Sequence, residues 1–266
     1  MTRRIGFAIV VLTAIAAVAG PSLVPYDAAA QDLPQRLLGP SWQHPFGLDE
    51  LGRDILARLL IGARISLMVG LAVVSISATV GTMVGAVAGY AGGWLDNALG
   101  RIMDVLLAFP RILLAIALVA VLGPSLTHVV LALVLIGWVS YARLVRGQVL
   151  KVRELDYVQA ARAVGAPVGR VIVRHVIPAT LSSVAVQATL GKAGAIIAEA
   201  SLSFLGLGVQ PPTPSWGTML DAGRSHLFDA PHLTVVPGVA IALLVLGFNF
   251  LGDGLRDLAD PKGQSR

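Results

Sequence analysis

An all-α membrane protein with six transmembrane helices is the fold class that this sequence predicts. Of its 266 residues, 56% are hydrophobic and only 13% are charged, and its mean hydropathy is +0.79. Soluble domains carry roughly a quarter of charged residues, so this low charge content indicates a membrane protein. Apolar runs long enough to cross a bilayer recur along the chain, with shorter polar segments between them.

These runs divide the chain into three regions. Residues 1–62 hold a first helix and a polar external segment, and residues 255–266 form a cytoplasmic tail. Residues 63–254 form the transmembrane core, with a polar loop at 150–178 and an external segment at 201–232. The expected spans of the core are about 65–90, 101–122, 127–146, 179–202 and 233–251.

The first apolar run, from Ile5 to Val24, follows Arg3 and Arg4. A cleaved signal peptide is the alternative, because Ala28–Ala30 resembles a cleavage site. We favour an uncleaved helix, since the run is long enough to span and several more spans follow. The basic flank predicts a cytoplasmic N-terminus, and six spans then place the C-terminus on the same side.

Composition also argues against several functions. The net charge is +5, but the basic residues lie in loops without aromatic interleaving, so the expected partner is membrane lipid and not nucleic acid. Cysteine is absent, which excludes disulfides and thiol chemistry. No phosphate-binding loop, HExxH motif or nucleophile elbow occurs, so we expect no catalytic residue, no metal and no cofactor in this chain. A catalytic interpretation of His44, Asp49 and Asp54 is possible, but a turn-rich external segment is preferred.

Small residues in the second span predict close helix packing. Gly81, Gly85 and Gly89 recur every four residues, which places them on one helix face. That face packs either on a partner subunit or on another helix of this chain.

The third span contains groups that are costly in a membrane. Asp104, Pro110 and Arg111 interrupt its first half, and Pro110 predicts a kink. Either this is a bent helix near a pathway, or Asp104 and Arg101 simply lie at the membrane interface.

The polar loop at 154–178 predicts a helical hairpin on the cytoplasmic side. Helix formers fill Leu155 to Val164, Gly165 suits a left-handed C-cap, and Pro167 suits the first position of a second helix. The loop is basic, as cytoplasmic loops are. The alternative is that these helices only rest on lipid headgroups.

The fifth span and the segment after it carry polar residues for which two arrangements are open. Lys192 and Glu199 lie about two turns apart on nearly one face. They face either a lumen or subunit interface, or neighbouring helices that pair with them structurally. The segment 201–231 is rich in proline and glycine and cannot face lipid, so it caps the outer mouth or docks on protein.

Three strings resemble the permeases of ABC importers. Ala160-Ala161, Gly165 and Ile177-Pro178 resemble the EAA loop of these permeases, with Gln159 in place of its leading Glu. The stretch from His44 to Asp54 resembles HPFGTDxxGRD, with Leu48 in place of Thr, and AEASLSFLGLGVQPPTPSWG resembles a further signature. From about His44 to Pro261 the chain resembles the C-type permease of the dipeptide/oligopeptide/nickel class.

This resemblance implies a permease subunit of an ATP-driven importer in a bacterial inner membrane. The implied partners are a second permease, two ABC ATPases or one fused ATPase that bind ATP and Mg, and an external substrate-binding protein. The implied substrates are dipeptides or oligopeptides, although members of the class also carry nickel complexes. The implied ATPase-coupling residues are Tyr157, Gln159, Ala160, Ala161, Arg162, Gly165, Ile177 and Pro178. The implied pathway or external gate residues are Lys192, Glu199, Ser203, Phe204, Gln210 and Trp216.

An ion-gradient-driven secondary transporter is the main alternative function. It predicts paired carboxylates or broken helices at mid-membrane and an inverted repeat. Glu199 and Asp104 are poor candidates for such a pair, and no repeat is evident. A membrane enzyme or a channel is less well supported, because the histidines are scattered and no selectivity-filter signature occurs.

Overall fold

A computed structural model describes residues 2–259, so the end of the predicted tail lies outside the described residues. The helices are α1 (Thr2–Leu23), α2 (Ile55–Ala91), α3 (Gly93–Ala108), α4 (Arg111–Leu122), α5 (Leu126–Val152), α6 (Asp156–Ala163), α7 (Val168–Val171), α8 (Ile177–Phe204), α9 (Trp216–Gly223) and α10 (His232–Ala259). In this described part, five helices are long and apolar enough to cross a membrane, or six if α3 and α4 form one bent span. The all-α prediction is confirmed.

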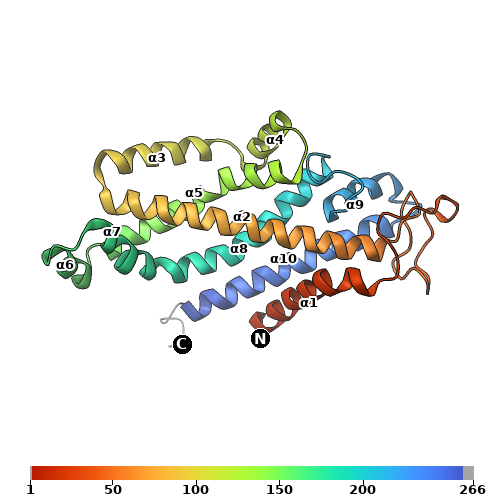
Figure 1. The fold of residues 1–266 in the computed structure, drawn as a ribbon, viewed down its shortest axis with the longest axis horizontal. Helices are drawn as coiled ribbons and strands as arrows, with labels where there is room; N and C mark the ends of the chain where they lie inside the picture. Colours follow the sequence, from red (N-terminus) through yellow and green to blue (C-terminus); the bar gives the residue numbers. More distant parts are fainter. Residues whose placement is uncertain (1, 260–266) are drawn as a thin grey trace.

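The long helices lie roughly side by side, and the bundle has two different ends (Figure 1). Helices α6 and α7 form one end, and the segment between α1 and α2 lies with α9 at the other. Helix α2 packs mainly on α5, and α10 packs on α1 and α8. The polar loop and the external segment of the sequence prediction therefore lie at opposite ends.

The glycine stripe of α2 packs on α5 of the same chain. A Cβ at Gly81 would approach Ala142 N to 2.9 Å, and one at Gly89 would lie 3.0 Å from Arg146 O. A Cβ at Gly85 would lie even closer to the backbone, against Ala142 O. The sequence left open whether the stripe packs on a partner subunit or on another helix of this chain. In the structure it packs on a helix of this chain.

The third predicted span is broken between α3 and α4. The two helices are bent by 87° across Phe109 and Pro110. Pro110 disfavours helical geometry at the preceding residue, and Phe109 is indeed extended, with φ −94° and ψ 140°. The kink expected at Pro110 is confirmed, and it turns the chain by nearly a right angle.

Two helices are longer than the predicted spans. Helix α2 begins at Ile55 because Asp54 caps it, with the carboxylate accepting a 2.8 Å hydrogen bond from Ala57 N. It therefore includes the last residues of the segment predicted to be external. The fifth span, expected to begin at residue 179, is continuous with the second helix of the hairpin. A π-helical segment at 172–176 joins α7 directly to α8, which gives one apolar helical run from Val168 to Phe204.

Candidate functional site

The hairpin turns at Gly165, between α6 and α7. Gly165 has φ +78°, the left-handed conformation expected of a glycine C-cap. Its N–H donates to Arg162 O at 2.9 Å, and Ala166 N–H donates to Ala161 O at 3.1 Å, which satisfies carbonyls at the end of α6. Pro167 lies at the N-cap of α7, one residue before its predicted position.

The hairpin has one face packed on the bundle and one face left open. Val158, Val171 and Val176 are fully buried and join the core made by α2 and α5. On the open face, Val164 is 84% exposed, and Val168 is also exposed. An exposed apolar surface beside exposed arginines (Arg162, Arg170 and Arg174) is typical of a protein-binding surface.

Gln159 closes the hairpin onto the end of α5. Its side-chain amide donates a 2.9 Å hydrogen bond to the carbonyl oxygen of Arg153. An ionised glutamate at this position has no donor for that bond. The substitution of Gln for the usual Glu therefore has a local structural effect, since it fastens α6 to the preceding helix.

The other predicted coupling residues lie along the same hairpin. Tyr157 is half exposed and its ring lies 6.3 Å from that of His175 across the turn. Ala160 and Arg162 are exposed, Ala161 packs against the core, and Ile177 and Pro178 open α8. The structure thus brings the whole predicted coupling set together, and its coupling role stays a prediction.

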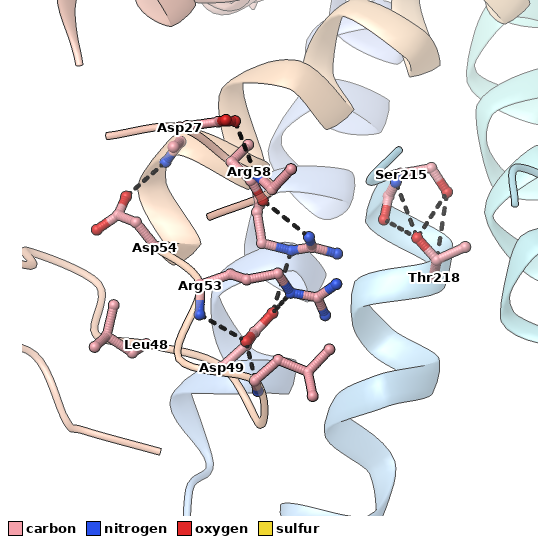
Figure 2. A network of polar contacts seen from close by, with 12 residues as sticks. Asp27, Leu48, Asp49, Arg53, Asp54, Arg58, Ser215 and Thr218 are labelled. Carbon is pink, nitrogen blue, oxygen red and sulfur yellow. Dashed lines mark hydrogen bonds and ion pairs between the residues drawn. The ribbon is translucent and has the colours of Figure 1, made fainter. Parts of the chain in front are cut away.

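A polar network fills the opposite end of the bundle (Figure 2). Asp49 pairs with Arg53 at 2.7 Å and with Arg58 at 3.3 Å, and all three side chains are buried. Arg58 also donates to Ala28 O at 3.1 Å. His44 pairs with Asp54 at 2.8 Å. The three residues that a catalytic interpretation would select are thus engaged in holding the segment folded.

The predicted gate residues do not form one site. Glu199 is fully buried, accepting a 2.7 Å hydrogen bond from Ser203 Oγ and a 3.5 Å bond from Ser66 Oγ of α2. Lys192 points elsewhere, with Nζ 5.6 Å from the centre of the Phe248 ring on α10. The sequence left open whether Lys192 and Glu199 face a lumen or subunit interface or pair with neighbouring helices. In the structure each of them contacts a neighbouring helix.

The remaining gate residues lie at the end of α8 and in the segment that follows it. Trp216 is buried and its indole N–H donates to Leu59 O at 2.9 Å. Phe204 packs under Arg224, and Gln210 donates to the carbonyls of Gly206 and Gly208 within its own loop. Their part in a pathway or gate stays a prediction.

A cavity lies on the other side of α8, among α2, α4, α5 and α8. Its volume is about 580 Å³, within the usual range for small-molecule sites. Most of its lining is apolar or small, and the polar side chains are Ser77, Arg111, Ser140, Tyr141, Gln187 and Ser201. None of these polar residues is among the predicted pathway residues, although the sequence analysis noted Arg111 as a costly charge in the third span.

Two aspartates of α3 are paired with arginines of α5. Arg146 binds Asp96 through Nε at 2.5 Å and Nη2 at 2.7 Å, and Arg143 binds Asp104. These pairs line a polar groove of about 650 Å³. Asp104, for which an interfacial or a pathway position was open, is therefore part of a link between α3 and α5, and it remains well exposed.

The fold and these sites define a class: a polytopic helical membrane protein with a surface hairpin at one end and a folded polar segment at the other. The sequence comparisons assign it further. Residues 81–263 match the family described as the binding-protein-dependent transport system inner membrane component, and the chain belongs to this family. It is a permease component of an ABC importer, and the ion-driven alternative is not supported.

Curated relatives agree with this assignment over nearly the whole chain. The dipeptide transport system permease protein DppC of Alkalihalophilus pseudofirmus is 46% identical over 261 residues, which cover 98% of this chain and 86% of that protein. The glutathione transport system permease protein GsiD of Shigella dysenteriae serotype 1 is 50% identical over 254 residues, with 95% and 84% covered. GsiD of Escherichia coli O157:H7 is 49% identical over the same length.

Proposed function

We propose that this chain is one of two permease subunits of an importer for short peptides. The relatives act on dipeptides and on glutathione, which are both small and carry free carboxylates. The partners would be a second permease, ABC ATPase subunits that bind ATP and Mg, and an external binding protein that delivers the peptide. Transport then requires the ATP-bound ATPases to favour one permease conformation over the other.

The observation that carries this proposal is the open face of the hairpin. Its inner valines are buried in the bundle, whereas Val164 and Val168 are exposed beside arginines. A rigid helix pair of this kind suits a groove on an ATPase subunit. Because α7 runs directly into α8, a displacement of the hairpin would be passed along a single helix to the far end of the bundle.

The orientation follows from the positions of the charges. The hairpin carries Arg162, Arg170 and Arg174, so we expect it to lie in the cytoplasm together with both termini, and the Asp49 segment to lie outside. The chain has no cysteine, so single cysteines can be introduced and labelled. Gly169→Cys and Ser41→Cys, both at exposed positions, should react with an impermeant maleimide from opposite sides of the membrane. Labelling from the same side would contradict this topology.

The direct test is ATP-driven uptake. The chain would be purified with its co-expressed partners and reconstituted in vesicles with binding protein outside and ATP inside. Uptake of a labelled dipeptide that depends on both ATP and binding protein supports the proposal. Isolation of the chain without a second permease or an ATPase, or uptake driven by an ion gradient alone, contradicts it.

Gly165 allows the coupling role to be tested separately. Gly165→Val places a β-branched residue in the left-handed region, at a cost of about 1–2 kcal/mol, whereas Asn is tolerated there. A Cβ at Gly165 meets no atom within 4 Å, so neither variant clashes with the rest of the chain. We expect Gly165→Val to hydrolyse ATP with little uptake and Gly165→Asn to retain most uptake. Full transport by the valine variant would contradict the coupling role.

A further inference from the structure

The cavity among α2, α4, α5 and α8 has an unusual distribution of charge. Arg111 is its only lining residue with a formal charge, and no lining residue is acidic. Arg111 is exposed, and within residues 2–259 no carboxylate forms an ion pair with it, as is also true of Arg101 in the other groove, whereas Arg143 and Arg146 of α5 are paired. A charge within a membrane-spanning segment is costly unless it faces water or a counter-charge.

Ser77 gives a second, independent indication of a polar ligand. Its side chain is 1% exposed and its Oγ has no hydrogen-bond partner among the described residues. Ser77 and Gly137 both line the cavity, and the Oγ packs directly against Gly137 of α5, where a Cβ would lie only 2.6 Å from it. A buried hydroxyl without a partner loses free energy, and a small rotation of this side chain toward the cavity would let a polar ligand there restore the hydrogen bond.

Arginine is well suited to one particular ligand group. Its planar guanidinium can bind both oxygens of a carboxylate at once, with more geometric specificity than a lysine ammonium. A short peptide carries a carboxylate at its C-terminus and fits a volume of about 580 Å³. The neutral hydroxyls and the amide oxygen of the lining can accept hydrogen bonds from the α-ammonium and the N–H groups of the peptide.

We propose that Arg111 is the residue that binds the carboxylate of the peptide during its passage through the membrane, with Ser77 as a neutral hydrogen-bonding partner. This rests on the proposed peptide import. The permease then discriminates by charge, in addition to whatever the binding protein selects: peptides with a free carboxylate are held in the cavity, and peptide amides are not.

The first test measures the electrostatics of the cavity. Ser140→Cys places the only cysteine of the chain in the lining. Its reaction rates with an anionic and a cationic methanethiosulfonate are compared in the purified complex. We expect the anionic reagent to be favoured, Arg111→Gln to lower the ratio of the two rates at least about threefold, and Arg111→Lys to keep it. An unchanged ratio in Arg111→Gln overturns the proposal.

The second test measures recognition of the carboxylate, without binding protein so that its selectivity cannot interfere. Dialanine and dialaninamide are tested for protection of Ser140→Cys against a neutral thiol reagent. Dialanine should protect, dialaninamide should not, and Arg111→Gln should abolish the difference. Equal protection by the two compounds, or a difference that persists in Arg111→Gln, overturns the proposal.

Uptake by reconstituted vesicles then links binding to transport. We expect Arg111→Gln to lower dipeptide uptake about tenfold or more, as loss of a charge-assisted hydrogen bond predicts. Arg101→Gln, which removes a charge from the other groove, is the matched control and should keep wild-type uptake. If the wild-type complex imports no peptide, the proposed function fails. If wild type and Arg111→Gln import equally, only the role of Arg111 fails.

Discussion

The Asp49 network and the open face of the hairpin, at opposite ends of the bundle, differ in whether their charged and large apolar side chains are buried. At the end that holds Asp49, charged side chains are buried and paired, and Trp216 is enclosed with its N–H bonded. At the hairpin end, charged side chains are exposed and so are large apolar ones such as Val164. The Asp49 network is complete within one chain, although Trp42 of the same segment is fully exposed, and the hairpin presents a surface that only a partner would cover.

This difference separates two kinds of effect. Substitutions in the Asp49 network should act on stability, because the partners of each group lie inside the chain. Substitutions on the open face of the hairpin should act on assembly, because the groups that they would contact lie outside it. The two expectations can be tested with melting temperatures and with binding of the ATPase subunits.

The largest expected effect on stability is that of Asp49→Ala. It leaves Arg53 and Arg58 buried without their shared carboxylate, and breaking a buried ion pair from one side costs about 3–5 kcal/mol. Thermal unfolding of the purified chain should show a large loss of stability. Asp221→Ala removes the partner of Arg224 in an exposed pair, and it should change stability by less than about 1 kcal/mol. Equal losses of stability in the two variants would show that the buried ion pairs of Asp49 matter no more than an exposed pair.

The hairpin offers a comparison between its two faces. Val158→Ala creates a cavity under α6 and should lower stability by about 1–3 kcal/mol, since Val158 is 0% exposed. Val164→Ser lies on the open face and should leave the melting temperature unchanged but weaken binding of the ATPase about tenfold. Pull-down titration with the purified ATPase measures the second effect. Undiminished ATPase binding by Val164→Ser would show that the open face is not the docking surface.

The sequence was sufficient for the features that depend on local pattern. Apolar runs predicted the all-α membrane class, Gly165 predicted the left-handed turn of the hairpin, and Pro110 predicted the break before α4. Each of these follows from the conformational limits of one residue or from a run of residues. The class of importer followed from the resemblance, and it is confirmed by the family match.

The features that depend on tertiary packing were not predictable. The glycines of α2 show that a helix approaches closely but not which one, and the structure places α5 there. Glu199 and Lys192 share a helix face in the sequence, yet one contacts α2 and the other α10. The absence of an ion pair to Arg111 among the described residues could not be foreseen either, because it depends on which acidic residues other helices bring near it.

The smallest expected effect concerns Asp229, in the loop before α10. A hydrogen bond from His226 lowers the pKa of the Asp229 carboxyl below its ordinary value, and Glu50 also faces that histidine at 4.0 Å. Because the folded-state pKa is the lower one, this stabilisation is present above the ordinary Asp pKa of about 4 and is lost as pH falls through the folded value. Asp229→Asn should therefore lower the melting temperature slightly at neutral pH and not at all in strong acid. The side chain is well exposed, so solvent screens the interaction, and a loss as large as that of Asp49→Ala would show that exposure does not separate the two sites.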